Sequence, residues 1–368
     1  MGAREVGGRG RTAIVLGTRP EIIKMSPVIR AFKKFNLDFY VLHTGQHYSF
    51  NMDRAIFEKL GLETPLHNLG TGSGTHGEET GKMLMGIERK LLEGGTSGVL
   101  LEGDTNTVLA GALAASKLRI RVGHVEAGLR SGDRGMPEEL NRIVADHLSD
   151  LLFAPTKRSR GNLLREGIDP ARIFVTGNTV VDAVKQNLEL AAETDLRGIV
   201  DGASKGYLVA TVHRQENVDN LATLRNVIEG LEQTSRTTGM IVIYPAHPRS
   251  SKAILEHRIK VDSRLVKVVP PLDYLRFLKL ESESKLILTD SGGVQEEACI
   301  LEVPCVTLRE NTERPETVEV GANVIAGTKP GTIVARAVEM LGKKRGWRNP
   351  FGDGRAAERI VQAWASSV

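Results

Sequence analysis

Five polar turns, each directly after an apolar run typical of a strand, hold the residues of this chain that are best suited to chemistry. In an open parallel sheet, ligands bind at the carboxyl ends of the strands, so side chains in such turns converge on one crevice. Several such turns in one chain therefore predict an active site. The turns are Gly17–Glu21, Gly103–Thr105, His124–Gly128, His213–Asn217 and Asp290–Glu297.

Three candidate catalytic residues are acids. Asp104 and Glu126 each follow closely on an apolar run, and Glu138 opens a predicted helix. Desolvation and the proximity of like charges raise the pKa of such acids toward neutrality, which lets one acid hold a proton while another accepts one. The grouping predicts acid–base catalysis, although Glu138 equally suits an ordinary helix amino-terminus.

His213 occupies the same kind of position in the second half of the chain, directly after the run Tyr207–Val212. It could donate a proton to a phosphate or to a leaving group, and Arg214 makes the turn more polar. Because a lone histidine is more often structural, this role is a hypothesis. The other histidines form no metal-binding motif that we recognise, so we predict no metal ion.

The turn after the first strand-like run combines a guanidinium group with a helix amino-terminus. Pro20, expected at the first helical position, and Glu21 are explained by helix capping alone. Arg19 is not, and its place beside the helix amino-terminus suits phosphate oxygens. Lys24 falls one helical turn further on and could face the same crevice, although a lone helical lysine is usually solvated.

Ser291, Gly292 and Gly293 form a second candidate anion site, ahead of a helix predicted to begin near Val294. Backbone amides in such a turn form an anion-binding nest, and two nests fit a diphosphate or a nucleotide. Glu296 and Glu297, in the first turn of that helix, suit ribose hydroxyls. An ordinary strand-to-helix turn explains the glycines equally well.

No nicotinamide or other cofactor is predicted. The segment Gly72–Gly77 has the glycine spacing of the dinucleotide fingerprint, but Pro65–Gly70 before it is not a convincing strand. We interpret the glycine-rich segment as a flexible loop and expect no NAD.

Repeated alternation of strand-like runs with amphipathic helical stretches must position these turns. The pattern starts again after the polar segment Asp195–Lys205. Parallel strands need both faces covered, so we predict an α/β fold of two Rossmann-like, doubly wound domains facing a central cleft. The strand-like runs include Thr12–Leu16, Asp38–His43, Gly98–Leu101, Arg121–Val125, Leu151–Ala154 and Ile173–Thr176, and later Tyr207–Thr211, Met240–Tyr244, Leu265–Val269, Lys285–Thr289 and Pro304–Leu308.

The predicted organisation has four parts. A disordered leader covers residues 1–11, a domain with the acid–base residues covers 12–200, and a nucleotide-binding domain covers 201–350. The C-terminal stretch, residues 351–368, holds a helix that is expected to cross back and pack on the first domain.

Composition narrows the class of protein. The 368 residues are 40% hydrophobic and 26% charged, without an apolar run long enough for a bilayer, so we expect no membrane partner. Aromatic residues are only 4%, which argues against a nucleic-acid partner despite the net charge of +4. Cys299 and Cys305 fit reduced, buried thiols, and we expect a cytoplasmic enzyme acting on an acidic small molecule.

Taken together, the motifs resemble the non-hydrolysing UDP-N-acetylglucosamine 2-epimerases along nearly the whole chain from Thr12 onward. The resemblance implies a GT-B-like pair of Rossmann-type domains, a homodimer, and interconversion of UDP-N-acetylglucosamine with UDP-N-acetylmannosamine. The matching motifs are Gly17–Glu21, Gly103–Thr105, His124–Arg130, Pro137–Glu139 with Asn141–Arg142, Gly177–Thr179, His213–Arg214, Asp290–Glu297 and Thr312–Glu316.

The resemblance also implies roles for individual residues. Asp104, Glu126 and Glu138 would be the catalytic acids, and His213 would assist departure and return of UDP. Phosphates would be held by Arg19, Ser291, Gly292 and Gly293, with Lys24 and Arg314 lining the site, Glu297 on the ribose, and Phe277 and the backbone near Leu272 framing the uracil.

A mechanism follows from the chemistry of the sugar, because no carbonyl group lies beside C2 to permit simple enolisation. Expelling UDP from C1 while the C2 proton is removed gives a glycal, and re-addition with protonation from the opposite face inverts C2. A related UDP-2-acetamido sugar remains an alternative substrate. A GT-B glycosyltransferase and a UDP-sugar-binding sensor remain alternative functions. Some bacterial relatives have a longer segment after the equivalents of Gln46 and His47 that binds activating substrate; here we expect no such activation.

Overall fold

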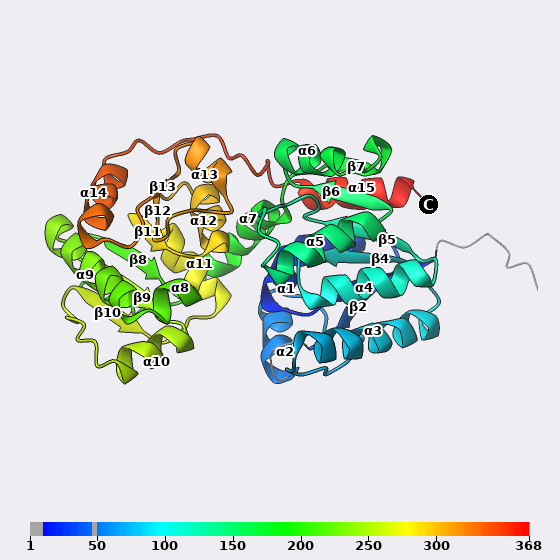
Figure 1. Cartoon of the computed structure of the whole chain (residues 1–368), viewed down its shortest axis with the longest axis horizontal. Coiled ribbons are helices and arrows are strands. Elements are labelled where there is room, and N and C mark those ends of the chain that lie inside the picture. The colour runs from blue at the N-terminus through cyan, green and yellow to red at the C-terminus, as the bar shows by residue number, and fades with distance from the viewer. Residues whose placement is uncertain (1–9, 46–49, 368) are drawn as a thin grey trace, which may run out of the picture. The chain divides into compact units, whose positions relative to one another are not determined.

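The computed structural model describes residues 10–45 and 50–367 and divides the chain into two compact units (Figure 1). Unit 1 comprises Met1–Ala183 together with Phe351–Val368, and unit 2 comprises Val184–Pro350. Most of the predicted leader, and the Gln46–His47 segment considered for activation, lie outside the described residues.

Unit 1 is built on a parallel sheet whose described strands number seven, in the order β3-β2-β1-β4-β5-β6-β7. Its central strands are buried almost throughout, as expected for a sheet covered on both faces. The strands are β1 (Arg11–Leu16), β2 (Phe39–His43), β3 (His67–Asn68), β4 (Thr96–Glu102), β5 (Arg121–Val125), β6 (Leu151–Ala154) and β7 (Ile173–Val175).

Helices connect these strands in chain order, which gives the predicted strand–helix winding. They are α1 (Arg19–Lys34), α2 (Phe50–Lys59), α3 (His76–Glu93), α4 (Asn106–Lys117), α5 (Pro137–Leu148), α6 (Lys157–Arg165), the 3-10 turn Pro170–Arg172, and α7 (Thr179–Ala192), which continues across the boundary into unit 2.

Unit 2 repeats this architecture with a parallel sheet of six described strands in the order β10-β9-β8-β11-β12-β13. The strands are β8 (Tyr207–Thr211), β9 (Ile241–Pro245), β10 (Val266–Val269), β11 (Leu286–Thr289), β12 (Cys305–Thr307) and β13 (Asn323–Ile325). The helices are α8 (Gln215–Val218), α9 (Leu221–Thr238), α10 (Pro248–Glu256), α11 (Tyr274–Ser282), α12 (Gly292–Ile300), α13 (Pro315–Glu319) and α14 (Pro330–Leu341).

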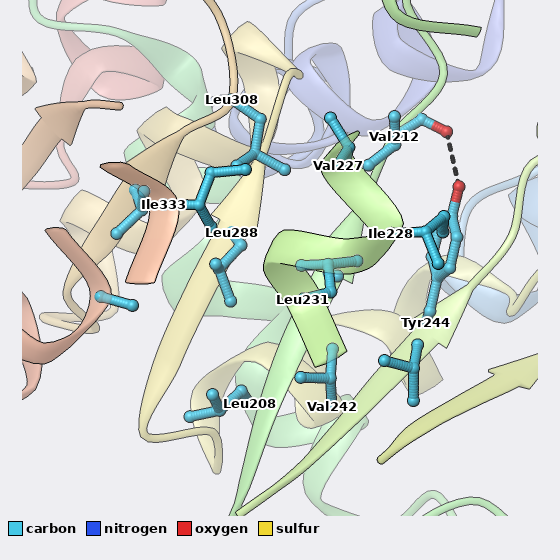
Figure 2. Close-up of a cluster of buried hydrophobic side chains, with 14 of the residues drawn as sticks. Leu208, Val212, Val227, Ile228, Leu231, Val242, Tyr244, Leu288, Leu308 and Ile333 are labelled. Atoms are coloured by element: carbon cyan, nitrogen blue, oxygen red, sulfur yellow. Dashed lines mark hydrogen bonds between the residues drawn. The ribbon is translucent and has the colours of Figure 1, made fainter. Parts of the chain in front are cut away.

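Figure 2 shows one face of the unit 2 sheet packed against its helices. Val227, Ile228 and Leu231 of α9 meet side chains from the central strands, and Tyr244 of β9 donates a hydrogen bond of 3.1 Å to the carbonyl oxygen of Val212. This bond satisfies the buried hydroxyl group of Tyr244 and fixes the backbone of the residue that directly precedes His213. The predicted fold of two Rossmann-like α/β domains is confirmed.

The C-terminal helix α15 (Ala356–Ser366) belongs to unit 1 and packs on α1. Its Trp364 is buried, and the indole nitrogen donates to Thr12 Oγ1 at 3.1 Å. Gly98 and Gly123 face the indole, and a Cβ on either would lie within 3 Å of it. The two glycines therefore make room for Trp364 against the sheet.

The predicted loop at Gly72–Gly77 is partly wrong. Only the part before Thr75 is a loop, because Thr75 caps α3 by accepting from Glu78 N, and α3 then includes Gly77. A two-residue strand, β3, precedes the loop. No helix within residues 10–45 and 50–367 is long and apolar enough to cross a membrane.

Candidate active site

In both units the strand order reverses at a switch point, between β1 and β4 in unit 1 and between β8 and β11 in unit 2. Ligands of doubly wound sheets bind beside such points, at the carboxyl ends of the strands. The turns after these four strands are among those that carry the predicted site residues. The fold thus places the predicted residues of these four turns where such a sheet binds ligands.

The turn after β1 is organised by the buried Glu21. Its carboxylate accepts hydrogen bonds from the backbone nitrogens of Gly17 and Thr18 and from the hydroxyl group of Thr105, which joins the β1 and β4 turns. Burial raises the pKa of Glu21 to about 7, against the lowering effect of these hydrogen bonds. Helix α1 begins at Arg19, so Pro20 is its second residue rather than its first.

Lys24 is not the solvated lysine that its isolated position suggested. Its ammonium group lies 2.8 Å from both carboxylate oxygens of Glu126 and 3.1 Å from Glu102 Oε1. Glu126 also accepts from Asn178 Nδ2 at 3.0 Å and has a left-handed backbone, with φ of 71°. A non-glycine residue in that conformation is strained, and such residues cluster at functional sites.

Asp104, in the turn after β4, is held by α5. The guanidinium group of Arg142 donates to Asp104 Oδ2, and Asn141 Nδ2 donates to the Asp104 carbonyl oxygen at 2.9 Å. The Asp104 side chain is partly exposed, so its carboxylate is fixed in direction while it remains open to solvent. Such a carboxylate suits proton exchange with a bound ligand.

Glu138 and Glu139, neighbours in the first turn of α5, have different roles. Glu139 is buried and accepts from the backbone nitrogens of Ser131 and Gly132, at 2.9 and 3.0 Å, which fixes the loop before the helix. Glu138 is exposed. Glu138, the predicted catalytic acid, therefore does not hold this loop, whereas Glu139 does.

His124, on β5, connects this strand to the turn after β4. Its Nδ1 lies 2.7 Å from Asp146 Oδ1 and its Nε2 lies 2.8 Å from the carbonyl oxygen of Gly103, and since both partners accept, both ring nitrogens must carry a proton. Burial alone disfavours this cation, but Asp146 and the Gly103 carbonyl group raise the pKa of His124 above its usual value. A buried imidazolium thus anchors the backbone next to Asp104.

In unit 2, the predicted His213 is oriented by Asp290. Asp290, after β11, is fully buried, lies 3.1 Å from His213 Nδ1, and accepts from the backbone nitrogens of His213 and Arg214 and from Asn217 Nδ2. Burial favours the neutral acid, yet the hydrogen bond and charge of His213 and the other donors hold the pKa of Asp290 below its usual value. With Nδ1 occupied, Nε2 of the part-exposed imidazole is the nitrogen available to a ligand.

The Ser291–Gly293 turn leads directly into α12, which begins at Gly292, two residues before the predicted start at Val294. Ser291 caps the helix by accepting from Val294 N. Neither glycine has a positive φ, and a Cβ on either would meet its neighbours only at 3.7 Å or more. The fold of unit 2 does not require glycine here, which favours a functional reason for it.

The remaining predicted binding residues lie on unit 2. Arg314 Nε pairs with the buried Glu296 Oε1 at 2.8 Å, which holds α13 to α12. Glu297 is half-buried beside Glu281, whose pKa is raised well above its usual value by burial and by Glu297. Leu272 and Phe277 pack partly against the hydrophobic core.

Comparison with known proteins identifies the family. The family model described as UDP-N-acetylglucosamine 2-epimerase matches residues 30–365. This chain belongs to that family. The UDP-N-acetylglucosamine 2-epimerase of Methanocaldococcus jannaschii is 54% identical over 96% of this chain and 98% of its own length, and that of Methanococcus maripaludis is 51% identical over 95% and 97%.

Solved structures of family members agree in fold with this chain. The crystal structure of the Methanocaldococcus jannaschii epimerase in complex with UDP-GlcNAc and UDP has a TM-score of 0.88 at 53% identity, covering 97% of this chain and 99% of that one. The Neisseria meningitidis enzyme bound to UDP-GlcNAc has a TM-score of 0.86 at 33% identity, covering 97% and 100%.

Sequence reasoning missed the partners that hold the predicted residues. Glu102 and Asp146 lie far along the chain from the residues they contact, and of these two only Glu102 directly precedes a recognised motif. Asn178 lies within the motif Gly177–Thr179, but its contact with Glu126 follows only from the fold. Asn217 and Arg142 lie within or beside such motifs, but their contacts, to Asp290 and Asp104, follow only from the fold. Among the described residues no group of three or more His, Cys, Asp or Glu could hold a metal ion.

Proposed function

We propose that this epimerase interconverts UDP-N-acetylglucosamine and UDP-N-acetylmannosamine by inverting C2 of the sugar. The main support is the acid cluster at the switch point of unit 1, where Asp104 and Glu126 follow neighbouring strands and each is held by a cation. Family membership and the relatives bound to UDP-GlcNAc give the substrate class.

The chemistry needs proton transfer on both faces of the sugar ring. A base takes the C2 proton, the C–H electron pair forms the C1–C2 double bond, and the C1–O pair leaves with UDP, giving 2-acetamidoglucal. Re-addition of UDP at C1 with protonation of C2 from the other face completes the inversion. Asp104, Glu126 and Glu138 supply the acids and bases of these steps, and His213 Nε2 assists the departing phosphate.

Unit 2 binds the nucleotide in this proposal. Ser291, Gly292 and Gly293 at the start of α12 hold a phosphate, helped by the helix dipole. The amides of Gly292 and Gly293 are the donors, because Ser291 N already donates to Thr289 Oγ1 at 2.9 Å. Glu297 binds the ribose, and Phe277 with the backbone at Leu272 borders the uracil. Arg19 adds a cation for the phosphates, and Lys24 and Arg314 line the site. We further propose that the active enzyme is a homodimer and that it works in the cytoplasm.

A related sugar is the second candidate substrate, because a relative that is 40% identical over 95% of this chain is the UDP-2,3-diacetamido-2,3-dideoxy-D-glucuronate 2-epimerase of Pseudomonas aeruginosa. That sugar carries the same acetamido group at C2, so the same elimination and re-addition would serve. The two substrates differ at C3 and C6 rather than at the reacting carbons.

Proton NMR in deuterated water tests the function directly. We expect deuterium to replace the C2 proton of UDP-N-acetylglucosamine as the manno-configured product appears. Exchange and product with the diacetamido sugar alone would transfer the assignment to that substrate. Binding without exchange of either sugar would overturn the epimerase proposal and favour a sensor.

The residue roles are tested by conservative substitutions. Asp104→Asn, Glu126→Gln and Glu138→Gln should keep UDP affinity and lower kcat by about a hundredfold or more, as expected for lost acid–base groups. Glu58→Gln, at an exposed glutamate paired with Arg54 on α2, is the control and should leave kcat unchanged. Near-normal kcat in all three acid variants would show that these residues are not the catalytic acids.

A further inference from the structure

Glu102, the last residue of β4, is a buried acid to which the proposed reaction assigns no role. Its side chain is 2% exposed and its Oε1 lies 3.1 Å from Lys24 Nζ. The same ammonium group contacts both oxygens of Glu126 at 2.8 Å. One cation therefore lies between two buried carboxyl groups, at the switch point of unit 1.

One ammonium charge cannot neutralise two buried carboxylates, and leaving either ionised without compensation is costly. Glu126 has the stronger set of donors, since it takes both short contacts with Lys24 and a third from Asn178 Nδ2 at 3.0 Å. Glu102 has the single, longer contact. The proton that balances the cluster therefore belongs on Glu102.

The two other acids that face Glu102 also favour its neutral form. Burial raises the pKa of Glu102 well above its usual value, Lys24 opposes this effect, and both Glu126 and Glu21 add to it. Glu21, on α1, is itself buried and brings a further acid to the cluster. The imidazolium of His124 also favours an ionised Glu126, but its charge is already paired with Asp146 at 2.7 Å. Lys24 therefore leaves room for at most one fully compensated carboxylate among the three acids.

We propose that Glu102 is a positioning residue that, as a neutral acid, holds Lys24 against Glu126 so that Glu126 alone receives the ammonium charge. The inference rests on the proposed function, in which Glu126 is an acid–base group. An ionised Glu102 would draw Lys24 toward itself and raise the proton affinity of Glu126. A neutral Glu102 keeps its carbonyl oxygen 3.1 Å from the ammonium group without competing for the charge.

Two variants separate this role from simple filling of space. Glu102→Gln keeps a neutral carbonyl acceptor for Lys24, whereas Glu102→Leu keeps similar volume and removes the acceptor. We expect Glu102→Gln to match the wild-type pH profile of kcat. We expect Glu102→Leu to lower kcat at least about tenfold, to change KM less, and to move the acid limb of the profile to higher pH.

A second readout does not depend on turnover. The infrared spectrum of the wild-type protein near neutral pH should contain a carbonyl band of the buried, protonated Glu102 beside those of Glu21 and Glu281, and this band should be lost in Glu102→Gln. If the band persists unchanged in Glu102→Gln, Glu102 is ionised and the proposal is overturned. Since this measurement needs no substrate, it stands even if the wild-type protein fails to epimerise UDP-N-acetylglucosamine.

The kinetic outcomes are equally decisive. A wild-type pH profile in Glu102→Leu would show that Lys24 needs no support from β4. Loss of activity or a shifted acid limb in Glu102→Gln would show that an ionisable carboxyl group is required, which contradicts a neutral acid. Should Glu102→Leu fail to fold, Glu102→Gln and its infrared spectrum decide between these outcomes.

Discussion

Lys24→Met tests the buried charge cluster of unit 1 through stability. The substitution keeps an unbranched chain of similar length and removes the cation that lies 2.8 Å from Glu126. Glu126 must then take up a proton when the unit folds. For a glutamate with an unfolded-state pKa of about 4.3, this costs about 3.7 kcal/mol near pH 7 and only about 1 kcal/mol near pH 5.

The predicted signature is therefore a loss of stability that shrinks by about 2.7 kcal/mol between neutral and mildly acidic pH. Urea unfolding followed by tryptophan fluorescence measures it. The chain has two tryptophans, and Trp364 is buried in unit 1 while Trp347 belongs to unit 2. A Trp347→Phe background therefore lets the fluorescence of Trp364 report on unit 1.

Lys33→Met is the matched control, because Lys33 lies on the same helix and pairs with the exposed Glu63. Its effect should stay within about 0.5 kcal/mol at either pH, as for most surface ion pairs. The reasoning is refuted if Lys24→Met destabilises unit 1 equally near pH 5 and pH 7, or no more than the control does.

Three further predictions concern other parts of the molecule. Asp290→Asn should lower kcat at least about tenfold with less effect on KM, since the buried anion that orients His213 is lost; steady-state kinetics measures this. Trp364→Ala should cost unit 1 about 3 to 5 kcal/mol in urea unfolding, because the pocket next to Gly98 is left empty. The stability of Glu21→Gln relative to wild type should increase by about 3 kcal/mol as pH rises from 4.5 to above 7. In the wild-type protein, burial raises the pKa of Glu21 to about 7, so Glu21 stabilises the fold fully below pH 4.5 and loses this contribution as pH rises through 7. Glutamine does not titrate, so the variant keeps the same stability contribution at this position, as urea unfolding at several pH values would show. A constant difference between Glu21→Gln and wild type across this range would contradict the assigned burial.

The winding of both units could be predicted because each buried strand is a short apolar run followed by a polar turn. Strands such as β5 and β8 match their predicted ranges, because a parallel strand that is buried on both faces is a nearly continuous run of apolar residues. The short edge strand β3 was missed because two residues carry no recognisable period. Edge strand β13 was not recognised either, and it has only three residues.

Side-chain partnerships were harder to predict than positions. Lys24 was expected to be solvated because helical spacing relates it only to its neighbours on α1, while its partner Glu126 lies 102 residues further along the chain. The choice between Glu138 and Glu139 likewise depends on the loop at Ser131, which only the folded chain brings to the helix. The catalytic and binding roles themselves stay predictions.

The return of α15 to unit 1 makes unit 1 discontinuous in sequence. Trp364 meets Thr12 across 352 residues, and all of unit 2 is synthesised between the first unit 1 segment and this helix. Unit 2 is continuous in sequence, so all of its residues are synthesised before the last segment of unit 1. Domains usually complete their folding in order from the amino-terminus, and here that order is reversed. Until α15 emerges, the hollow at Gly98 and Gly123 exposes apolar sheet, and a nascent or truncated chain presents that surface to chaperones and proteases.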